Sequence, residues 1–491
     1  MKKPASATGG LTGSYSADPA DLFTQLYDLL PDGPFRNREV TRWDRDPEVA
    51  RLAEQVYECV LDQGAMKPGD LGRMLEGAGH RGVFAVLRGL DWALAHVNPF
   101  SAAFDYGRLA SLVTRYAETG QLNDADATDG ALLPRCAYPG RPRGGNSKAS
   151  FFGVHRVPAE IWGQIQYERI KARHEPHFRR DQPVVIGCAP ILESFADVQL
   201  EFSEQDGNSV FRLGPVDSAG LRARIDAVVK KLDESSARIG VMPEGALSDD
   251  LLAYWKTVGY ATAERGKALR WLLVGSGPLG DADPPPNRAV LLDRWTGDSL
   301  LAQDKLSSFT LTVEQTSDWK LAEQPINGTA AEYMTQGSAI SVRESSLGRL
   351  AVLICEDLTQ SDGWEREILA YGVSHLLVPI FSKPIMHYRW EQTAAERQIN
   401  NMGSWIVIAN SLVVDRALGN SSTNGDRHTC LVAGPGDSNR ANYRYNLQFG
   451  TAEAGGELGQ VLLDGVLGLP SVRTAAVNDA WLGNGGRPQG T

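Results

Sequence analysis

The sequence contains few cysteines, no long apolar run and no excess of basic residues, and each absence excludes a class of protein. The five cysteines are odd in number and scattered over 491 residues, which argues against a disulfide framework and favours a reducing cytoplasm. No apolar run approaches the roughly eighteen residues of a membrane-spanning helix. With 49 basic and 60 acidic residues the net charge is −11, which argues against nucleic acid as a partner. We therefore expect a cytoplasmic protein with no membrane segment.

The chain is long enough for two or three domains, and its N-terminal end has a helical pattern. Residues 1–14 are small, polar and Gly-rich without the hydrophobic stretch of a signal peptide, which predicts a disordered tail. In residues 15–120, Asp18 and Asp46 each precede a proline, as an N-cap precedes the first helical residue. Leucines and valines then recur at helical spacing. We predict an all-helical N-terminal domain, acting either as a separate module for a protein partner or as a lid over a site elsewhere.

The next two segments are predicted to connect this domain to the rest of the chain. Residues 121–149 lose the periodicity and accumulate Gly, Pro, Asn and Asp, which predicts a linker. Residues 150–181 are predicted to be a basic helical connector, with the helix over residues 158–173. A solvated helix face is the favoured interpretation of its basic run, and a phosphate-binding patch remains the alternative. Pro176 interrupts the alignment of His174 with His177, so no metal site is predicted there.

Three short apolar segments each end next to a residue that can take part in chemistry. Residues 350–354 form an apolar run typical of a buried strand, and Cys355 follows it. Residues 239–242 precede Glu244 by one proline, and an apolar pair at residues 300–301 precedes Lys305. Folds of the α/β class place their chemistry beyond the carboxyl ends of strands, where a cysteine near a cation can be a nucleophile. Alone, Cys355 could equally be a small buried hydrophobic residue.

The order Glu244, Lys305, Cys355, each at the mouth of a strand, resembles the nitrilase or carbon–nitrogen hydrolase superfamily over residues 182–436. The resemblance implies an α/β fold, a four-layer α-β-β-α sandwich, with residues 437–491 as a C-terminal extension. It implies that Glu244 is the general base, Lys305 the oxyanion stabiliser and Cys355 the nucleophile that forms a thioester. Many members of the family add a second glutamate after the lysine, and Glu314 is the candidate.

The same resemblance suggests a substrate class and an assembly. The triplet Cys-Glu-Asp at residues 355–357 resembles the glutaminase-type branch more than the Cys-Trp-Glu of true nitrilases. Because no ATP-pyrophosphatase domain follows, as it does in NAD synthetases, the substrate stays open among small amides, carbamoyl compounds and, with less support, nitriles. The family's outer helices commonly pair into dimers, and residues 364–371 lie where that pairing usually occurs, so a homodimer or higher homo-oligomer is expected.

Two further interpretations concern cofactors and a function without catalysis. Residues 275–280 match the G-x-G-x-x-G pattern, but three prolines follow where a dinucleotide site needs a helix, so no cofactor is expected. The alternative to an enzyme is a nitrilase-fold scaffold or regulatory binding protein that acts through its N-terminal helices, including a role in phage defence. An intact set of Glu244, Lys305 and Cys355 favours the enzyme.

Overall fold

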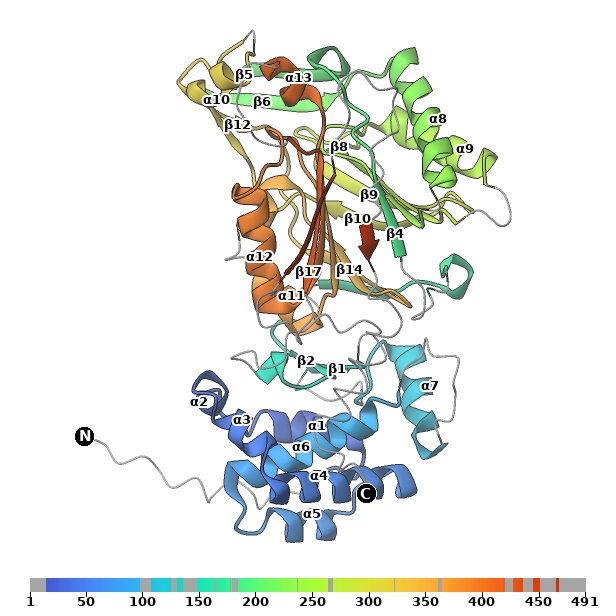
Figure 1. The fold of residues 1–491 in the computed structure, drawn as a ribbon, viewed down its shortest axis with the longest axis vertical. Coiled ribbons are helices and arrows are strands. Elements are labelled where there is room, and N and C mark those ends of the chain that lie inside the picture. The colour runs from blue at the N-terminus through green and yellow to red at the C-terminus, as the bar shows by residue number, and fades with distance from the viewer. Residues whose placement is uncertain are drawn as a thin grey trace, which may run out of the picture.

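The computed structural model describes residues 15–97, 107–124, 130–135, 148–162, 165–176, 178, 184–235, 237–263, 268–321, 323–360, 364–419, 427–435, 445–450 and 465–467. Helices gather at the N-terminal end of the molecule, and a mixed α/β part follows (Figure 1). The predicted disordered tail, residues 1–14, lies outside the described residues. Within the described part, no helix is both long and apolar enough to cross a membrane.

The N-terminal helices begin where the sequence predicts caps. The carboxylate of Asp18 accepts the backbone N–H of Ala20 at 2.9 Å, and that of Asp46 accepts the N–H of Glu48 at 2.9 Å. Their apolar faces share one core in which the rings of Phe23 and Phe152 meet edge to face. The helices are α1 (Pro19–Tyr27), α2 (Gly33–Arg36), α3 (Glu39–Asp44), α4 (Pro47–Gln63), α5 (Pro68–Leu75), α6 (Gly79–Leu94) and α7 (Ala110–Thr119).

Strands occupy the segments predicted to be a linker and a helical connector. Strand β1 (Gly130–Leu133) pairs antiparallel with β2 (His155–Pro158), and β3 (Ile165–Arg169) pairs parallel with β13 (Ile340–Ser345). The helix predicted over residues 158–173 is therefore wrong, because pairing with a distant strand overrides the local helical pattern. The basic run is solvated only in part. Lys171 and Arg173 are exposed, as predicted, whereas the Arg169 guanidinium lies over the Tyr116 ring and His174 is buried against Asp293. His177, Arg179 and Arg180 lie outside the described residues.

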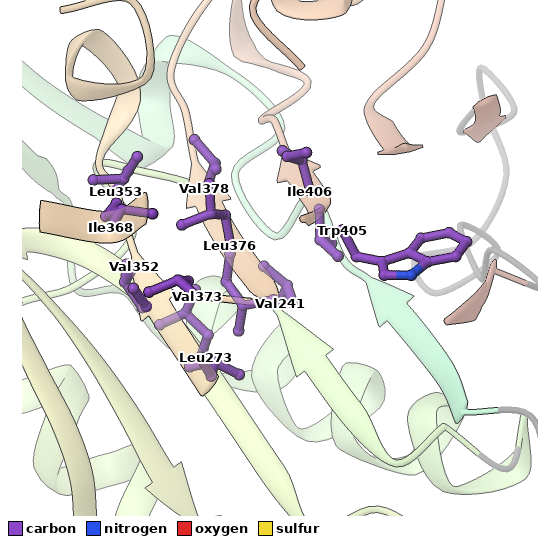
Figure 2. Packing of buried hydrophobic residues seen from close by; sticks show 14 of the residues in the cluster. Val241, Leu273, Val352, Leu353, Ile368, Val373, Leu376, Val378, Trp405 and Ile406 are labelled. Atoms are coloured by element: carbon purple, nitrogen blue, oxygen red, sulfur yellow. The ribbon is translucent and has the colours of Figure 1, made fainter. Parts of the chain in front are cut away.

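Two large sheets pack face to face through one apolar core. The six-stranded sheet has the order β10-β9-β8-β7-β4-β19, and the seven-stranded sheet has the order β18-β17-β16-β15-β14-β13-β3. Figure 2 shows Val241 and Leu273 of the first sheet packed against Val352 and Leu376 of the second. The strands not yet bounded are β4 (Val184–Cys188), β7 (Ile239–Val241), β8 (Trp271–Pro278), β9 (Asn287–Asp293), β10 (Ser299–Asp304), β14 (Gly348–Val352), β15 (His375–Pro379), β16 (Trp405–Ala409), β17 (Cys430–Pro435), β18 (Tyr445–Gly450) and β19 (Gly465–Leu467).

Helices cover the outer faces of both sheets. On the six-stranded sheet, α8 (Ala219–Glu234) and α9 (Asp249–Ala261) bury Leu221, Trp255 and their neighbours against β8 and β9. On the seven-stranded sheet, α11 (Glu365–Tyr371) and α12 (Trp390–Met402) bury Ile368 and Ile399. One side of α11 also lies against β2, and the ring of Trp162 stacks on that of Tyr371 at 5.8 Å.

A third, four-stranded sheet lies beyond the ends of the other two, at the top of Figure 1. Strands β5 (Val198–Gln205) and β6 (Asn208–Pro215) form an antiparallel hairpin, and its turn has positive φ at Asp206 and Gly207. Strand β12 (Thr329–Glu332) pairs parallel with β6 and antiparallel with β11 (Thr310–Thr312). Two short helices, α10 (Val313–Asp318) and α13 (Val413–Leu418), lie at the same end of the molecule.

Helix α7 contacts the end of β13, next to the first residues of β14. The hydroxyls of Tyr116 and Tyr167 both donate to the buried carboxylate of Glu344. The Arg349 guanidinium lies 3.2 Å from the same carboxylate and donates to the carbonyl of Pro134 at 2.6 Å. This buried polar cluster joins α7 and the segment after β1 to the seven-stranded sheet.

Candidate active site

Cys355 is the third residue after β14, where a short 3-10 helix (Cys355–Leu358) begins. Its φ of 50° is in the left-handed region, which a non-glycine residue adopts only at a conformational cost. The side chain is buried in the core between the two large sheets. A strained turn at a strand end holds the thiol at one fixed position, a common arrangement for a reacting group.

Glu244 and Lys305 reach the same place from the other large sheet. Glu244 is the third residue after β7, and Lys305 follows β10 directly. The Lys305 ammonium lies 2.8 Å from Oε1 of Glu244, and both side chains are almost fully buried. Oε2 of Glu244 accepts the backbone N–H of Phe381 at 3.1 Å, and the Glu244 charge acts on the neighbouring Cys355 thiol by raising its pKa. The three residues predicted from the sequence are therefore brought together.

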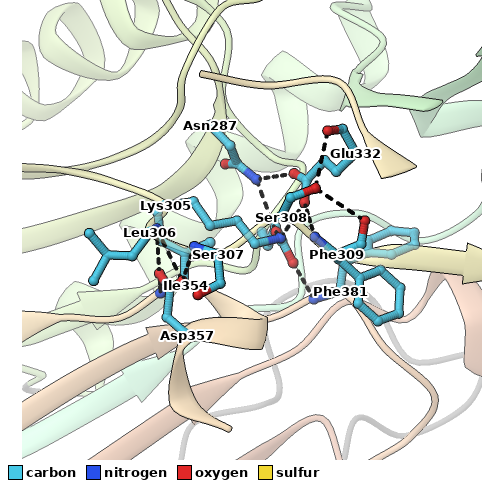
Figure 3. Close-up of polar contacts among 11 residues, drawn as sticks. Asn287, Lys305, Leu306, Ser307, Ser308, Phe309, Glu332, Ile354, Asp357 and Phe381 are labelled. Carbon is cyan, nitrogen blue, oxygen red and sulfur yellow. Dashed lines mark hydrogen bonds and ion pairs between the residues drawn. The ribbon is translucent and has the colours of Figure 1, made fainter. Parts of the chain in front are cut away.

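The second glutamate at this site is Glu332 and not Glu314. The Lys305 ammonium lies 2.6 Å from Oε2 of Glu332, the last residue of β12 (Figure 3). Glu314 lies exposed in the first turn of α10, so its predicted role is wrong. The segment 313–318 became a helix because Thr312 and Gln315 form a capping box, which turns Glu314 toward solvent.

Asn287 joins the two carboxylates and was not identified from the sequence. Its side-chain Nδ2 donates to Oε1 of Glu244 and to Oε1 of Glu332, both at 2.9 Å. Asn287 is the first residue of β9 and is buried. Because Asn287 begins a strand instead of following one, the signal that marked Glu244 and Cys355 did not apply to it, and the preceding prolines suggested only a loop.

Burial and neighbouring charge set the protonation of the site. Burial raises the pKa of the Cys355 thiol well above its usual value, and the Glu244 charge raises it further, while Lys305 partly offsets them. Burial lowers the pKa of Lys305, but Glu244 and Glu332 outweigh it and hold that pKa well above its usual value. Burial also raises the pKa of Glu244, against the opposing effect of Lys305. The raised pKa favours the thiol form of Cys355 over the thiolate.

Comparison with known proteins gives similarity of fold alone. No family model matches the sequence, and no curated protein matches it. Among solved structures, Nit3 of Saccharomyces cerevisiae, a nitrilase superfamily member, is 10% identical, with 52% of this chain and 83% of that chain covered and a TM-score of 0.33. A carbon–nitrogen hydrolase of Helicobacter pylori is 12% identical, with 52% and 83% covered and a TM-score of 0.30. A glutamine-dependent NAD(+) synthetase of Cytophaga hutchinsonii is 14% identical, with 55% and 43% covered and a TM-score of 0.31. The structures that resemble this chain thus include nitrilase superfamily members.

Proposed function

We propose that the protein is a thiol hydrolase of the carbon–nitrogen hydrolase type that cleaves a non-peptide C–N bond of a small amide or carbamoyl compound. The observation that carries this proposal is the buried ammonium of Lys305 between the carboxylates of Glu244 and Glu332, beside a buried Cys355 thiol whose pKa responds to the charges of Glu244 and Lys305. A base, a nucleophile and a fixed cation are the groups that amide hydrolysis requires.

In the first half of the reaction, Glu244 takes the proton from the Cys355 thiol while sulfur attacks the substrate carbonyl carbon. The carbonyl oxygen gains negative charge, and the ammonium of Lys305 stabilises it in a site shielded from water. The tetrahedral intermediate collapses as the C–N bond breaks. Glu244 gives its proton to the departing nitrogen, which leaves as ammonia or an amine, and the acyl group remains on sulfur as a thioester.

In the second half, Glu244 takes a proton from a water molecule that attacks the thioester carbonyl. The C–S bond breaks, the carboxylic acid leaves, and the proton returns to the Cys355 sulfur. Glu332 does not exchange a proton in this scheme. Glu332 keeps Lys305 charged and, through Asn287, holds the Glu244 carboxylate in position beside the Cys355 sulfur. No cofactor is needed to balance either half.

The proposal includes the architecture and assembly implied by the resemblance. The two helix-covered sheets support a four-layer α-β-β-α sandwich preceded by a helical domain. One side of α11 is already covered by β2. A homodimer that pairs the outer helices of the seven-stranded sheet would therefore have to use another side of these helices. A scaffold role for the N-terminal helices remains the second candidate, which the intact site disfavours because a scaffold does not need a buried Glu-Lys-Glu cluster.

The deciding experiment is a screen of small primary amides and carbamoyl compounds for ammonia release, with mass spectrometry of rapidly quenched enzyme. We expect an acyl adduct on the peptide that carries Cys355 with at least one substrate. Matched nitriles should be poorer substrates. Ammonia release that persists in Cys355→Ala would overturn the mechanism, and a complete absence of turnover across the screen would favour the scaffold.

A further inference from the structure

We propose that Asp357 is a positioning residue that fixes Lys305 relative to Cys355, an inference that rests on the function proposed above. Its carboxylate accepts the backbone N–H of Leu306 at 3.1 Å and that of Ser307 at 2.8 Å. It also accepts the N–H of Ile354 at 3.1 Å. Figure 3 shows these contacts beside Lys305.

These three N–H groups belong to the two segments that carry the reacting side chains. Leu306 and Ser307 directly follow Lys305, beyond β10 of the six-stranded sheet, and Ile354 directly precedes Cys355, beyond β14 of the seven-stranded sheet. The Asp357 carboxylate therefore connects the segments that follow β10 and β14, two strands that belong to different sheets. The distance from the ammonium to the sulfur depends on this joint, and misplacement by about 1 Å can cost on the order of 100-fold in rate.

The chemistry of the contact favours an acceptor with no proton of its own. Asp357 is fully buried, and burial raises its pKa to about 7, against the opposing effects of Lys305 and the three backbone N–H groups. An amide at this position keeps one acceptor oxygen and turns an NH₂ group toward a backbone N–H. Asp357→Asn should therefore separate the two segments without emptying the space.

Alkylation of Cys355 by iodoacetamide tests this without any substrate. Lys305 lowers the pKa of the Cys355 thiol, so a displaced ammonium should slow alkylation at pH 8. We expect Asp357→Asn to slow alkylation of Cys355 about tenfold or more. In a Lys305→Gln background the same substitution should slow alkylation little further, because both substitutions remove the same effect of the Lys305 ammonium on the thiol. With a substrate in hand, kcat should fall while KM changes little.

Asp91→Asn is the matched control. Asp91 is also fully buried and accepts two backbone N–H groups, those of Gly153 at 2.7 Å and Val154 at 3.0 Å, but it lies among the N-terminal helices. It should lower the melting temperature and leave alkylation unchanged. If Asp357→Asn does not fold, Asp357→Ser, which keeps a smaller acceptor, replaces it.

Two results would overturn the role of Asp357: alkylation at the wild-type rate in a folded variant, or effects of Asp357→Asn and Lys305→Gln that multiply. The proposed hydrolase could survive either result, since wild-type turnover is measured separately. Conversely, a wild-type protein that hydrolyses no amide would contradict the proposed hydrolase function but would not change the alkylation result.

Discussion

The ammonium of Lys305 lies 2.6 Å from Oε2 of Glu332, a residue 27 positions further along the chain that reaches the site from the four-stranded sheet. Because both groups are buried, loss of the Glu332 charge should change the protonation and position of Lys305.

Glu332→Gln is expected to reduce kcat/KM about 100-fold or more while the protein stays folded, because the glutamine keeps the shape but loses the charge. Steady-state kinetics with a substrate from the screen measures this. Glu314→Gln is the matched control, and since Glu314 is exposed in α10 it should keep near wild-type activity. A larger loss of activity in Glu314→Gln than in Glu332→Gln would instead support Glu314 as the second glutamate, as the sequence predicted.

Cys355→Ala should abolish turnover and acyl-enzyme formation, because it removes the nucleophile and only one small side chain from a strand end. Circular dichroism and ammonia release together check that the fold remains and the reaction does not. Cys188→Ala provides the comparison, since Cys188 is equally buried at the end of β4 but has no place in the cluster. Loss of activity in both variants would point to a packing effect.

Glu244→Gln should separate turnover from thiol acidity. Turnover should fall about 100-fold or more because the proton acceptor is gone. The Glu244 charge raises the pKa of the Cys355 thiol, so its removal should lower that pKa and move the alkylation midpoint to lower pH. Lys305→Gln should move the midpoint to higher pH, since Lys305 lowers the same pKa. Midpoints that move together in the two variants would contradict this account.

Wild-type enzyme should also lose activity on acidification earlier than an ordinary glutamate would require. Glu244 must be ionised to accept the thiol proton, and burial raises its pKa above the usual value of about 4.3. The acid limb of the kcat/KM profile should therefore lie above pH 4.3, with activity lost as pH falls through it. A limb at or below that value would show that another group is the base.

Tyr116→Phe should destabilise the fold by about 1.5–3 kcal/mol, because it removes a donor to the buried charge of Glu344. Urea unfolding gives the difference. Tyr57→Phe is the control: the Tyr57 hydroxyl meets His96 in an exposed contact, and its loss should cost about 0.5 kcal/mol or less. Equal losses would mean that the buried cluster does not hold the N-terminal helices in place.

These contacts also bear on the choice between module and lid. Helix α7 meets the seven-stranded sheet at Glu344, and Pro134, after β1, meets it at Arg349. Cys355 lies beyond the opposite end of β14, about 20 Å away by strand geometry. In Figure 1 the helices lie at the end of the molecule opposite β12, which supplies Glu332. This position disfavours the lid.

Local signals in the sequence predicted the parts of the structure that local interactions determine. Asp18 and Asp46 cap their helices through their own neighbours, and Cys355 follows a strand whose burial is visible as an apolar run. Glu332 could not be found this way, because β12 is short and takes its place by pairing with β6, over a hundred residues earlier in the chain. Strand β3 was mistaken for helix for the same reason: its partner β13 begins at Ile340.

The two short strands near the C-terminus, β18 and β19, each pair with an outer strand of a different large sheet. Without them, β17 and β4 would each present a row of unpaired backbone groups to other chains. Exposed strand edges of this kind recruit further strands and lead to aggregation. A chain ending at residue 436, the boundary that the resemblance suggests, would keep the cluster of Glu244, Lys305 and Cys355 but expose the edges of β17 and β4. We therefore expect the described strands β18 and β19 to protect solubility, and insoluble inclusion bodies to be the product of that truncation.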